Sequence, residues 1–297
     1  MYHSHLLINV GDNPDRPDWS ITRRWLRNLY RVHQRLCMAF PSKVPVSHKE
    51  RLAAYCAPYS GTGLDHLRNL PGEPDTADVH HSRSDQAGFL FRIDYPVDHS
   101  RGVRRPLIIV QSAGNEPPDW HYAFGLNEDA VDDGGRPIGN AGFLLAAPPQ
   151  TRRITMSLEN DDVFVIGSPK ENHRIAPGDL VRFRLRANPT RKVQDGSPNG
   201  SRKRICPTLV DHADWLKGKL GDAADSPVCL ENFVTGWAYG WRSKHEPQPS
   251  QRMQWWSVLF EGSFRVGNLK VLKQLLECGI GPAKAFGFGL LSIAPVR

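Results

Sequence analysis

The C-terminal segment 279–297 constrains the fold of this chain more than any other part of the sequence. Four glycines alternate there with Lys284 and two phenylalanines, and a short apolar stretch then ends the chain. Glycine adopts backbone conformations that are closed to other residues, so the segment predicts a tight connection from a helix into a final strand. Leucines recurring on one face predict that helix from Asn268 to Cys278, with Asn268 as its N-cap and Gly279 as its stop.

This glycine-rich segment has a functional interpretation and a structural one. Consecutive backbone N–H groups in such a loop can form a concavity that binds an anion, and Lys284 adds a positive charge to it. In the structural interpretation, the glycines only permit a tight helix-to-strand connection, and the loop by itself favours neither. The order of elements argues against a nucleotide cofactor, because the known glycine-rich nucleotide motifs lie between a strand and a following helix.

The predicted elements form two similar runs along the chain. Strands are expected at 5–10, 88–95, 106–111, within 151–166, and at 180–187, 232–241, 255–266 and the C-terminus. Helices are expected from Asp18 to about Ala39, at 210–220 and at 268–278. Each half approximates β-α-β-β-α-β, the ferredoxin-like unit, although the second helix of the first half is weak. We therefore expect an α+β chain of two tandem ferredoxin-like domains, 1–165 and 166–297, with insertions near 41–85 and 112–150.

The overall charge suits a polyanionic partner. The 297 residues include 38 Lys and Arg against 31 Asp and Glu, a formal net charge of +7. Arginine outnumbers lysine, and planar guanidinium groups suit phosphate contacts and base stacking. No apolar run has membrane-spanning length, and no signal-peptide pattern opens the chain. The five cysteines form no C-x-x-C pair, so we expect a soluble cytoplasmic protein without a zinc site, disulfide framework or other cofactor.

The first long helix combines an apolar stripe with a cationic face. The stripe, which must face the core, consists of Ile21, Trp25, Leu29, Val32 and Leu36. The cationic face consists of Arg23, Arg24, Arg27, Arg31 and Arg35. Tyr30 and His33 are three residues apart and therefore neighbours on the helix, and we expect His33 at the border between stripe and cations. Histidine can take and give a proton near neutral pH, although the helix alone favours an ordinary boundary histidine.

A third pattern is a basic, hairpin-like arm in the second half. Strand alternation from Val181 places Arg182, Arg184 and Arg186 on one sheet face, opposite an apolar face. A turn rich in Gly, Ser, Pro and Asn follows, and then a second basic run, 202–204. A merely solvated face usually mixes both charge signs, so this arm favours nucleic-acid binding over a structural role.

These residues carry a resemblance to a known family. The stretches 183–191, 260–262 and 279–292 resemble the CasE family, the CRISPR repeat-processing endoribonucleases of type I-E systems. The opening strand and the Tyr30-x-x-His33 helix also fall where that family has them. The resemblance covers both ends and most of the second half, but not residues 41–85 or 112–165.

The resemblance implies two tandem ferredoxin-like domains and cleavage of CRISPR precursor RNA at the 3′ base of the repeat hairpin. His33 would be the principal proton-transfer residue and Tyr30 its partner. Their chemistry would need no metal: the ribose 2′-OH attacks the adjacent phosphate and leaves a 2′,3′-cyclic phosphate and a 5′-OH. The protein would stay bound to the mature crRNA with other subunits in Cascade, meeting target DNA only through that complex and no membrane.

The same resemblance implies a set of RNA-binding residues. The basic arm would contribute Arg186, Arg191, Lys192, Arg202, Lys203 and Arg204. The glycine-rich loop would hold the RNA backbone near the cleavage site through Gly281, Lys284 and Phe286. The helix itself, apart from the resemblance, adds Arg27 and Arg31, which would flank the histidine and could stabilise negative charge on the phosphate.

Two functions from other classes remain open at this stage. One is a non-catalytic RNA-recognition module, because residues 284–291 resemble the aromatic RNP1 segment that stacks unpaired bases. They depart from it at Ala285, Gly289 and Leu291, and RNP1 belongs on a central strand. The other is a non-catalytic, RNA-binding structural subunit of a ribonucleoprotein. A metal-dependent nuclease is disfavoured, because no metal-ligand cluster stands out in the sequence.

Overall fold

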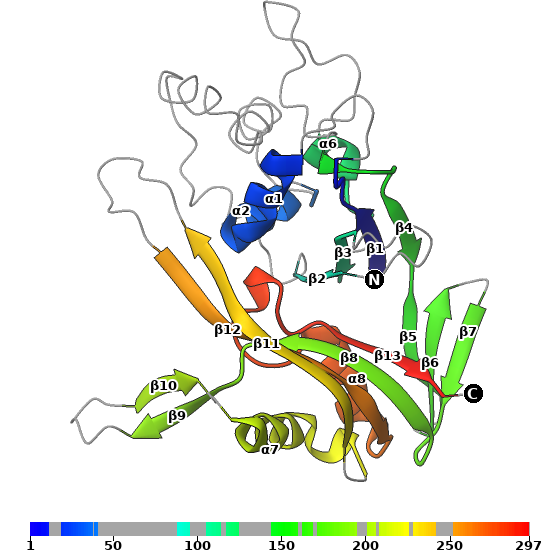
Figure 1. The fold of residues 1–297 in the computed structure, drawn as a ribbon. Coiled ribbons are helices and arrows are strands. Elements are labelled where there is room, and N and C mark those ends of the chain that lie inside the picture. Colours follow the sequence, from blue (N-terminus) through cyan, green and yellow to red (C-terminus); the bar gives the residue numbers. More distant parts are fainter. Residues whose placement is uncertain are drawn as a thin grey trace, which may run out of the picture. The chain divides into compact units, whose positions relative to one another are not determined.

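The fold is α+β, with several antiparallel sheets (Figure 1). The computed structural model describes residues 1–11, 19–37, 39–40, 88–95, 105–113, 117–124, 144–159, 162–168, 171–194, 201–205, 208–225, 228–241 and 252–296. Most of the predicted insertions at 41–85 and 112–150 lies outside these ranges. No helix in the described ranges is long and apolar enough to cross a membrane.

The chain divides into two compact units. Unit 1 comprises Met1–Phe89, Ile93–Arg152 and Tyr239–Met253. Unit 2 comprises Leu90–Arg92, Arg153–Ala238 and Gln254–Arg297. Each unit therefore takes segments from distant parts of the sequence.

The N-terminal sheet contains four strands in the order β2-β3-β1-β4. These are β1 (Tyr2–Leu7), β2 (Phe89–Asp94), β3 (Leu107–Ser112) and β4 (Gln150–Arg153). β1 pairs antiparallel with β3, from Tyr2 opposite Ser112 to Leu7 opposite Leu107. Between these strands the chain forms α1 (Trp19–Arg27), α2 (Leu29–Cys37) and the short α6 (Trp120–Phe124). The three predicted strands up to residue 111 are thus confirmed, with the first beginning three residues earlier than expected.

The first helix is interrupted, in contrast to the single helix predicted up to Ala39. α1 ends at Arg27 and α2 begins at Leu29, with Asn28 in neither helix. The Asn28 N–H donates to the Trp25 carbonyl, a tighter turn than an α-helix makes. The apolar stripe is confirmed where its side chains are described, because Trp25, Leu29, Val32 and Leu36 are all buried.

The C-terminal sheet contains four strands in the order β11-β12-β8-β13. These are β8 (Leu180–Ala187), β11 (Cys229–Trp241), β12 (Arg252–Arg265) and β13 (Leu291–Pro295). Both β12 and β13 pair antiparallel with β8. Along the chain, α7 (Leu209–Leu220) follows the first of these strands and α8 (Leu269–Cys278) follows the third. In each four-stranded sheet, the second strand in sequence is thus at one edge, followed by the third, the first and the fourth.

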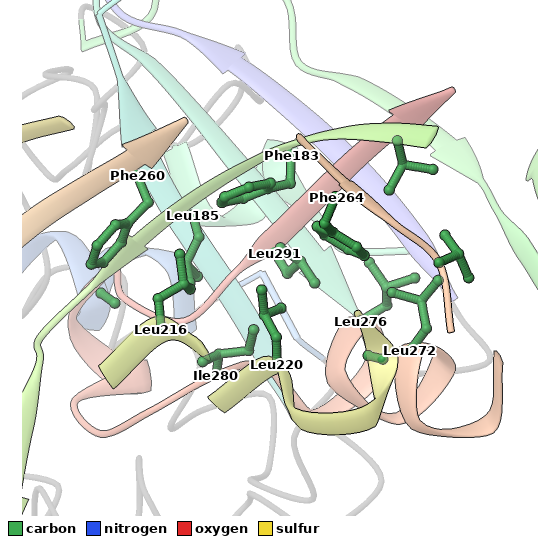
Figure 2. Close-up of a cluster of buried hydrophobic side chains, with 14 of the residues drawn as sticks. Phe183, Leu185, Leu216, Leu220, Phe260, Phe264, Leu272, Leu276, Ile280 and Leu291 are labelled. Carbon is green, nitrogen blue, oxygen red and sulfur yellow. The ribbon is translucent and has the colours of Figure 1, made fainter. Parts of the chain in front are cut away.

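α7 and α8 cover one face of this sheet (Figure 1). Between sheet and helices lies a buried apolar cluster (Figure 2) that includes Phe183, Leu185, Leu216, Leu220, Phe260, Phe264, Leu272, Leu276, Ile280 and Leu291. Fully burying one such side chain stabilises the fold by roughly 1.5–3 kcal/mol. The alternation predicted for β8 is confirmed: Val181 and Leu185 lie in the core, while Arg182 is exposed and Arg184 pairs with Glu261.

Capping residues start α7 and α8, and a glycine ends α8. The Thr208 hydroxyl accepts from the Asp211 N–H at the start of α7, and the Asp211 side chain accepts from the Thr208 N–H. The Asn268 side chain accepts from two N–H groups in the first turn of α8, as predicted. Gly279, with φ of 71°, donates its N–H to the Leu275 carbonyl and ends α8.

Further strands in the described ranges complete the structure. β5 (Thr155–Glu159), β6 (Val163–Ser168) and β7 (Glu171–Ile175) form a three-stranded antiparallel sheet in chain order. β9 (Thr190–Gln194) and β10 (Ser201–Ile205) form a two-stranded hairpin, which confirms the predicted arm. The short helical turns η3 (Gly221–Ala223) and η4 (Lys284–Phe286) follow α7 and α8.

Candidate functional site

Asn28 fixes the start of the helix that carries Tyr30 and His33. Its side chain is 1% exposed and pairs with the backbone of Trp241, which also belongs to unit 1. Nδ2 donates to the Trp241 carbonyl and Oδ1 accepts from the Trp241 N–H, each at 3.0 Å. The Asn28 carbonyl accepts from the N–H groups of Arg31 and Val32, so it also starts the hydrogen bonding of α2. Sequence reasoning missed this residue, although asparagine inside a predicted helix is a signal of a break.

His33 is buried, and the predicted border position is wrong. Its ring is 3% exposed and stacks on Phe89, with centroids 5.7 Å apart and planes inclined by 22°. Phe89 in turn stacks on Phe40 at 4.6 Å. The Cys37 sulfur lies 3.5 Å from Nε2 of His33, one helical turn further on. The helix periodicity alone could not show this, because Phe89 comes from β2.

The cationic face of α1 and α2 is smaller than predicted. Arg27 is exposed and Arg31 is half-buried, with Nη1 donating to Gln34 Oε1 at 3.4 Å. Arg35 is 2% exposed and donates from Nη1 to the Ala123 carbonyl at 2.9 Å. Its placement on the solvent face was therefore wrong, because α6 supplies a buried carbonyl partner.

Backbone geometry and packing explain the glycines of the C-terminal loop. Their φ values are 71°, 79°, 83° and 87° at Gly279, Gly281, Gly287 and Gly289. A Cβ at Gly281 would lie 2.9 Å from the Trp215 ring, and one at Gly289 would lie 2.7 Å from the Ile280 carbonyl oxygen. Such contacts leave no room for a side chain, so the structural interpretation is sufficient for these glycines.

The two functional candidates of η4 both have partners within unit 2. Lys284 Nζ donates to the carbonyl of Cys278 at 2.6 Å, where a cation is favourable because it faces the C-terminus of α8. Phe286 stacks on Trp255 of β12, with centroids 4.4 Å apart and planes inclined by 28°. Trp255 was missed by sequence reasoning, since it approaches the loop only through the sheet.

The basic arm is joined to α7 at its base. The Trp215 indole N–H donates to the Thr190 carbonyl at 3.1 Å, and Arg191 Nη1 lies 3.5 Å from Asp211 Oδ1. The Thr208 hydroxyl donates to Asp211 and lowers the pKa of that carboxyl, and the positive charge of Arg191 adds to this shift. Arg191 itself remains 64% exposed.

The register of the hairpin concentrates positive charge. Arg204 lies opposite Arg191, Lys203 opposite Lys192, and Arg202 opposite Val193. The side-chain positions of Lys192 and of the three β10 cations lie outside what the structure describes. The two strands contain five cationic residues, two from β9 and three from β10, and no acidic residue. Such a ribbon suits contact with phosphates.

Arg186 links the arm's preceding strand to the glycine-rich loop. The Gly289 N–H donates to the Arg186 carbonyl at 2.7 Å, so the two predicted binding regions meet within unit 2. A second arginine supports this region and was missed by sequence reasoning. Arg92 is 2% exposed and donates from Nη1 to the carbonyls of Arg184 and Leu290 and to the Ser292 hydroxyl, at 3.0–3.1 Å. Across the described part of the chain, no three His, Cys, Asp or Glu side chains gather as a metal site.

Comparisons with known proteins identify the family. Residues 71–295 match the model of the family described as CRISPR associated protein. The chain is 32% identical to the CRISPR-associated endoribonuclease Cse3 of Thermus thermophilus over 212 residues, which are 69% of this chain and 80% of that protein. It is 32% identical to the CRISPR system Cascade subunit CasE of Escherichia coli over 149 residues, 44% of this chain and 66% of that protein.

A solved structure shares the fold. The structure of CRISPR endoribonuclease Cse3 bound to a 19 nt RNA aligns with 99% of this chain and 100% of its own, with 22% identity and a TM-score of 0.51. At this identity the similarity concerns the fold alone. Family membership rests on the sequence matches, which extend over residues 71–295 of this chain for the family model and over 80% of Cse3. The chain belongs to the CasE/Cse3 (Cas6e) family of CRISPR-associated endoribonucleases, the type I-E Cascade subunits.

Proposed function

We propose that this chain is a metal-independent endoribonuclease that cleaves CRISPR precursor RNA at the base of the repeat hairpin. The observation that carries the proposal is the 32% identity with the endoribonuclease Cse3 over 80% of that protein's length. The basic hairpin of unit 2 and the formal net charge of +7 support an RNA substrate, because phosphate contacts dominate nucleic-acid affinity.

In this proposal the RNA supplies its own nucleophile. The 2′-OH on the 5′ side of the cleavage site attacks the adjacent phosphorus, and the bond from phosphorus to the 5′ oxygen breaks. His33 is the principal group that moves the proton from the 2′-OH, and Tyr30 is its partner for the leaving oxygen. The products are a 2′,3′-cyclic phosphate and a 5′-OH, and no metal takes part.

The buried ring of His33 sets a condition on this chemistry. A general base must come within hydrogen-bonding reach of the proton that it takes. Since the ring is 3% exposed and stacked on Phe89, that contact has to open before His33 reaches RNA. Arg27 and Arg31 then offer positive charge to the phosphate in the transition state.

RNA binding is assigned to three groups of residues. The arm group comprises Arg186, Arg191, Lys192, Arg202, Lys203 and Arg204, and the helix group comprises Arg27 and Arg31. The loop group comprises Gly281, Lys284 and Phe286. Lys284 can hold a phosphate while keeping its bond to the Cys278 carbonyl, because an ammonium group has three donors.

The shared strand order supports two tandem ferredoxin-like domains. A β-α-β-β-α-β chain of that fold places its second, third, first and fourth strands in this order, and both four-stranded sheets do so. We assign the domains to 1–165 and 166–297. The protein remains on the mature crRNA in the cytoplasm as a subunit of Cascade, the complex to which its Escherichia coli relative belongs by name, and it meets target DNA only through that complex.

One observation favours a second function. The burial of His33 fits a non-catalytic subunit that binds the repeat RNA without cutting it. Incubating the purified protein with its native repeat RNA in excess chelator separates the two functions. The proposal predicts one cut at the hairpin base, and no cut when the nucleotide at that position lacks its 2′-OH. Binding without any cut would favour the structural subunit, and cutting of the 2′-deoxy RNA would contradict the mechanism.

A further inference from the structure

Unit 2 carries an exposed tryptophan that the proposed function does not use. Trp237 lies near the end of β11, an edge strand of the C-terminal sheet, and its residue surface is 45% exposed. Tryptophan is enriched at binding interfaces, where its indole offers a large flat apolar surface for stacking. The exposed ring of Trp237 is therefore a candidate contact for a binding partner.

The ring of Trp237 is held in place by a second tryptophan. The rings of Trp237 and Trp256 are 5.2 Å apart in a T-shaped arrangement, with planes inclined by 68°. The Trp256 indole N–H donates to Nε2 of His212 at 3.2 Å, and His212 is itself 2% exposed. A T-shaped contact leaves at least one face of the Trp237 indole clear of Trp256. The arrangement is thus a two-tryptophan platform, in which Trp237 is 45% exposed and Trp256 is tied to α7 through His212.

The platform and the basic arm meet at the same turn of α7. His212, which holds Trp256, is adjacent in sequence to Asp211, which pairs with Arg191 at the base of the arm. The two strands of the hairpin, which include Arg191, contain five cationic residues and no acidic one. A stacking surface beside a cationic ribbon is the combination by which proteins bind single-stranded RNA, with bases on the aromatic ring and phosphates along the cations.

We propose that Trp237 is a stacking site for an unpaired nucleotide that flanks the hairpin of the repeat RNA. A base inside the paired stem has both faces in the helical stack, so a nucleotide outside the stem is the one that can lie on the indole. A protein partner would also fit an exposed tryptophan, but the adjoining cations favour a polyanion. This inference rests on the proposed RNA-binding function and extends it to a second contact outside the hairpin.

The test compares two RNAs that differ only in their unpaired flanks. Both carry a 2′-deoxy nucleotide at the cleavage position, so that binding is measured without cutting. One consists of the repeat hairpin alone, and the other has a few unpaired nucleotides on each side. The measured quantity is the ratio of the two dissociation constants for wild type, Trp237→Ala and Trp237→Phe. The matched control is Val234→Ala, which removes apolar surface that is 56% exposed on the same strand, three residues away.

Wild-type protein should bind the flanked RNA more tightly than the bare hairpin. Trp237→Ala should reduce this preference at least about fivefold, the lower end of what one stacked base contributes, whereas Trp237→Phe should keep most of it. Val234→Ala should behave as wild type. An equal preference in wild type and Trp237→Ala would overturn the inference. So would a Trp237→Ala protein that keeps the preference but no longer associates with other Cascade subunits, because a protein would then cover the ring.

The outcome also separates this inference from the function beneath it. A wild-type protein that neither binds nor cuts the repeat hairpin contradicts the proposed function and the inference with it. A wild-type protein that binds and cuts the hairpin but shows no Trp237-dependent preference contradicts the inference alone.

Discussion

The side-chain amide of Asn28 forms two hydrogen bonds with the backbone of Trp241, one from Nδ2 to the carbonyl and one from the N–H to Oδ1, each at 3.0 Å. The amide thus bonds the N–H and C=O of Trp241 as the backbone of a neighbouring strand would, although the two residues are 213 positions apart in sequence. Because Asn28 also separates α1 from α2, it fixes where the helix with Tyr30 and His33 begins.

Asn28→Ala should therefore destabilise the protein by about 1–3 kcal/mol, since it leaves two part-buried backbone groups of Trp241 without their partner. Asn28→Asp removes the donor but keeps the acceptor, and it should also be less stable than wild type. Chemical denaturation measures both differences. A stability equal to wild type in Asn28→Ala would show that the pair contributes nothing to folding.

Gly289→Ala should be destabilising for a different reason. An alanine there would adopt φ near 87° and place its Cβ about 2.7 Å from the Ile280 carbonyl oxygen. The left-handed conformation alone costs roughly 1–2 kcal/mol, and the close contact adds to it. Gly218→Ala is the matched control, because Gly218 lies within α7, in its last turn, with nothing within 4 Å of the new Cβ.

The control should move stability in the opposite direction. Alanine in a helix interior is more stable than glycine by roughly 0.5–1 kcal/mol. Thermal or denaturant unfolding of the two variants and of wild type measures both changes in stability, a loss for Gly289→Ala and a gain for Gly218→Ala. If Gly289→Ala were as stable as wild type, the packing explanation for the glycine-rich loop would fail.

How far the sequence predicts this structure depends on the range of the contacts involved. The limits of β8, α7 and α8 followed from local patterns: alternation from Val181 to Ala187, and caps at Asn268 and Gly279. Side-chain periodicity and capping are local effects, so a single sequence contains them.

The features that the sequence did not predict depend on distant partners. The helix break needs Trp241, and the burial of His33 needs Phe89, whose strand is 56 residues further along the chain. Likewise, Arg92 reads as a charge within an apolar strand, and only the structure shows its three acceptors from the region of β8 and β13. The periodicity of a single helix or strand contains no information about such distant partners.

Arg191→Gln should weaken binding of the repeat RNA and flatten its salt dependence. Removing one phosphate contact lowers the slope of log affinity against log salt by roughly 0.7–0.9. Stability should stay close to that of wild type, because the Arg191 side chain is 64% exposed and an ion pair of such a side chain contributes little. Titrations at several salt concentrations measure the slope.

Arg174→Gln is the matched control for this variant. Arg174 is 63% exposed and pairs with Glu159, so its loss changes net charge and removes one ion pair in the same way. It lies on β7, outside the arm. Equal slopes for Arg191→Gln and Arg174→Gln would contradict a specific role of the arm in RNA binding.

The lowered pKa of Asp211 predicts a pH dependence of stability. The folded-state pKa lies below the ordinary value of 3.8, so the unfolded state binds the proton more readily. The carboxylate therefore contributes its stability above that value and loses it as the pH falls through the folded-state pKa. Asp211→Asn does not titrate, so the stability difference from wild type should be constant near neutral pH and shrink below about pH 4. A difference that is unchanged in acid would contradict the assigned cap.

The most direct test of the central claim is the rate of cutting of the native repeat RNA by wild type and His33→Ala in excess chelator, with the product ends mapped. The account predicts that wild type leaves a 2′,3′-cyclic phosphate at the hairpin base, whereas His33→Ala binds the hairpin but does not cut it. Undiminished cutting by His33→Ala would contradict the account, because the imidazole would then have no part in the chemistry.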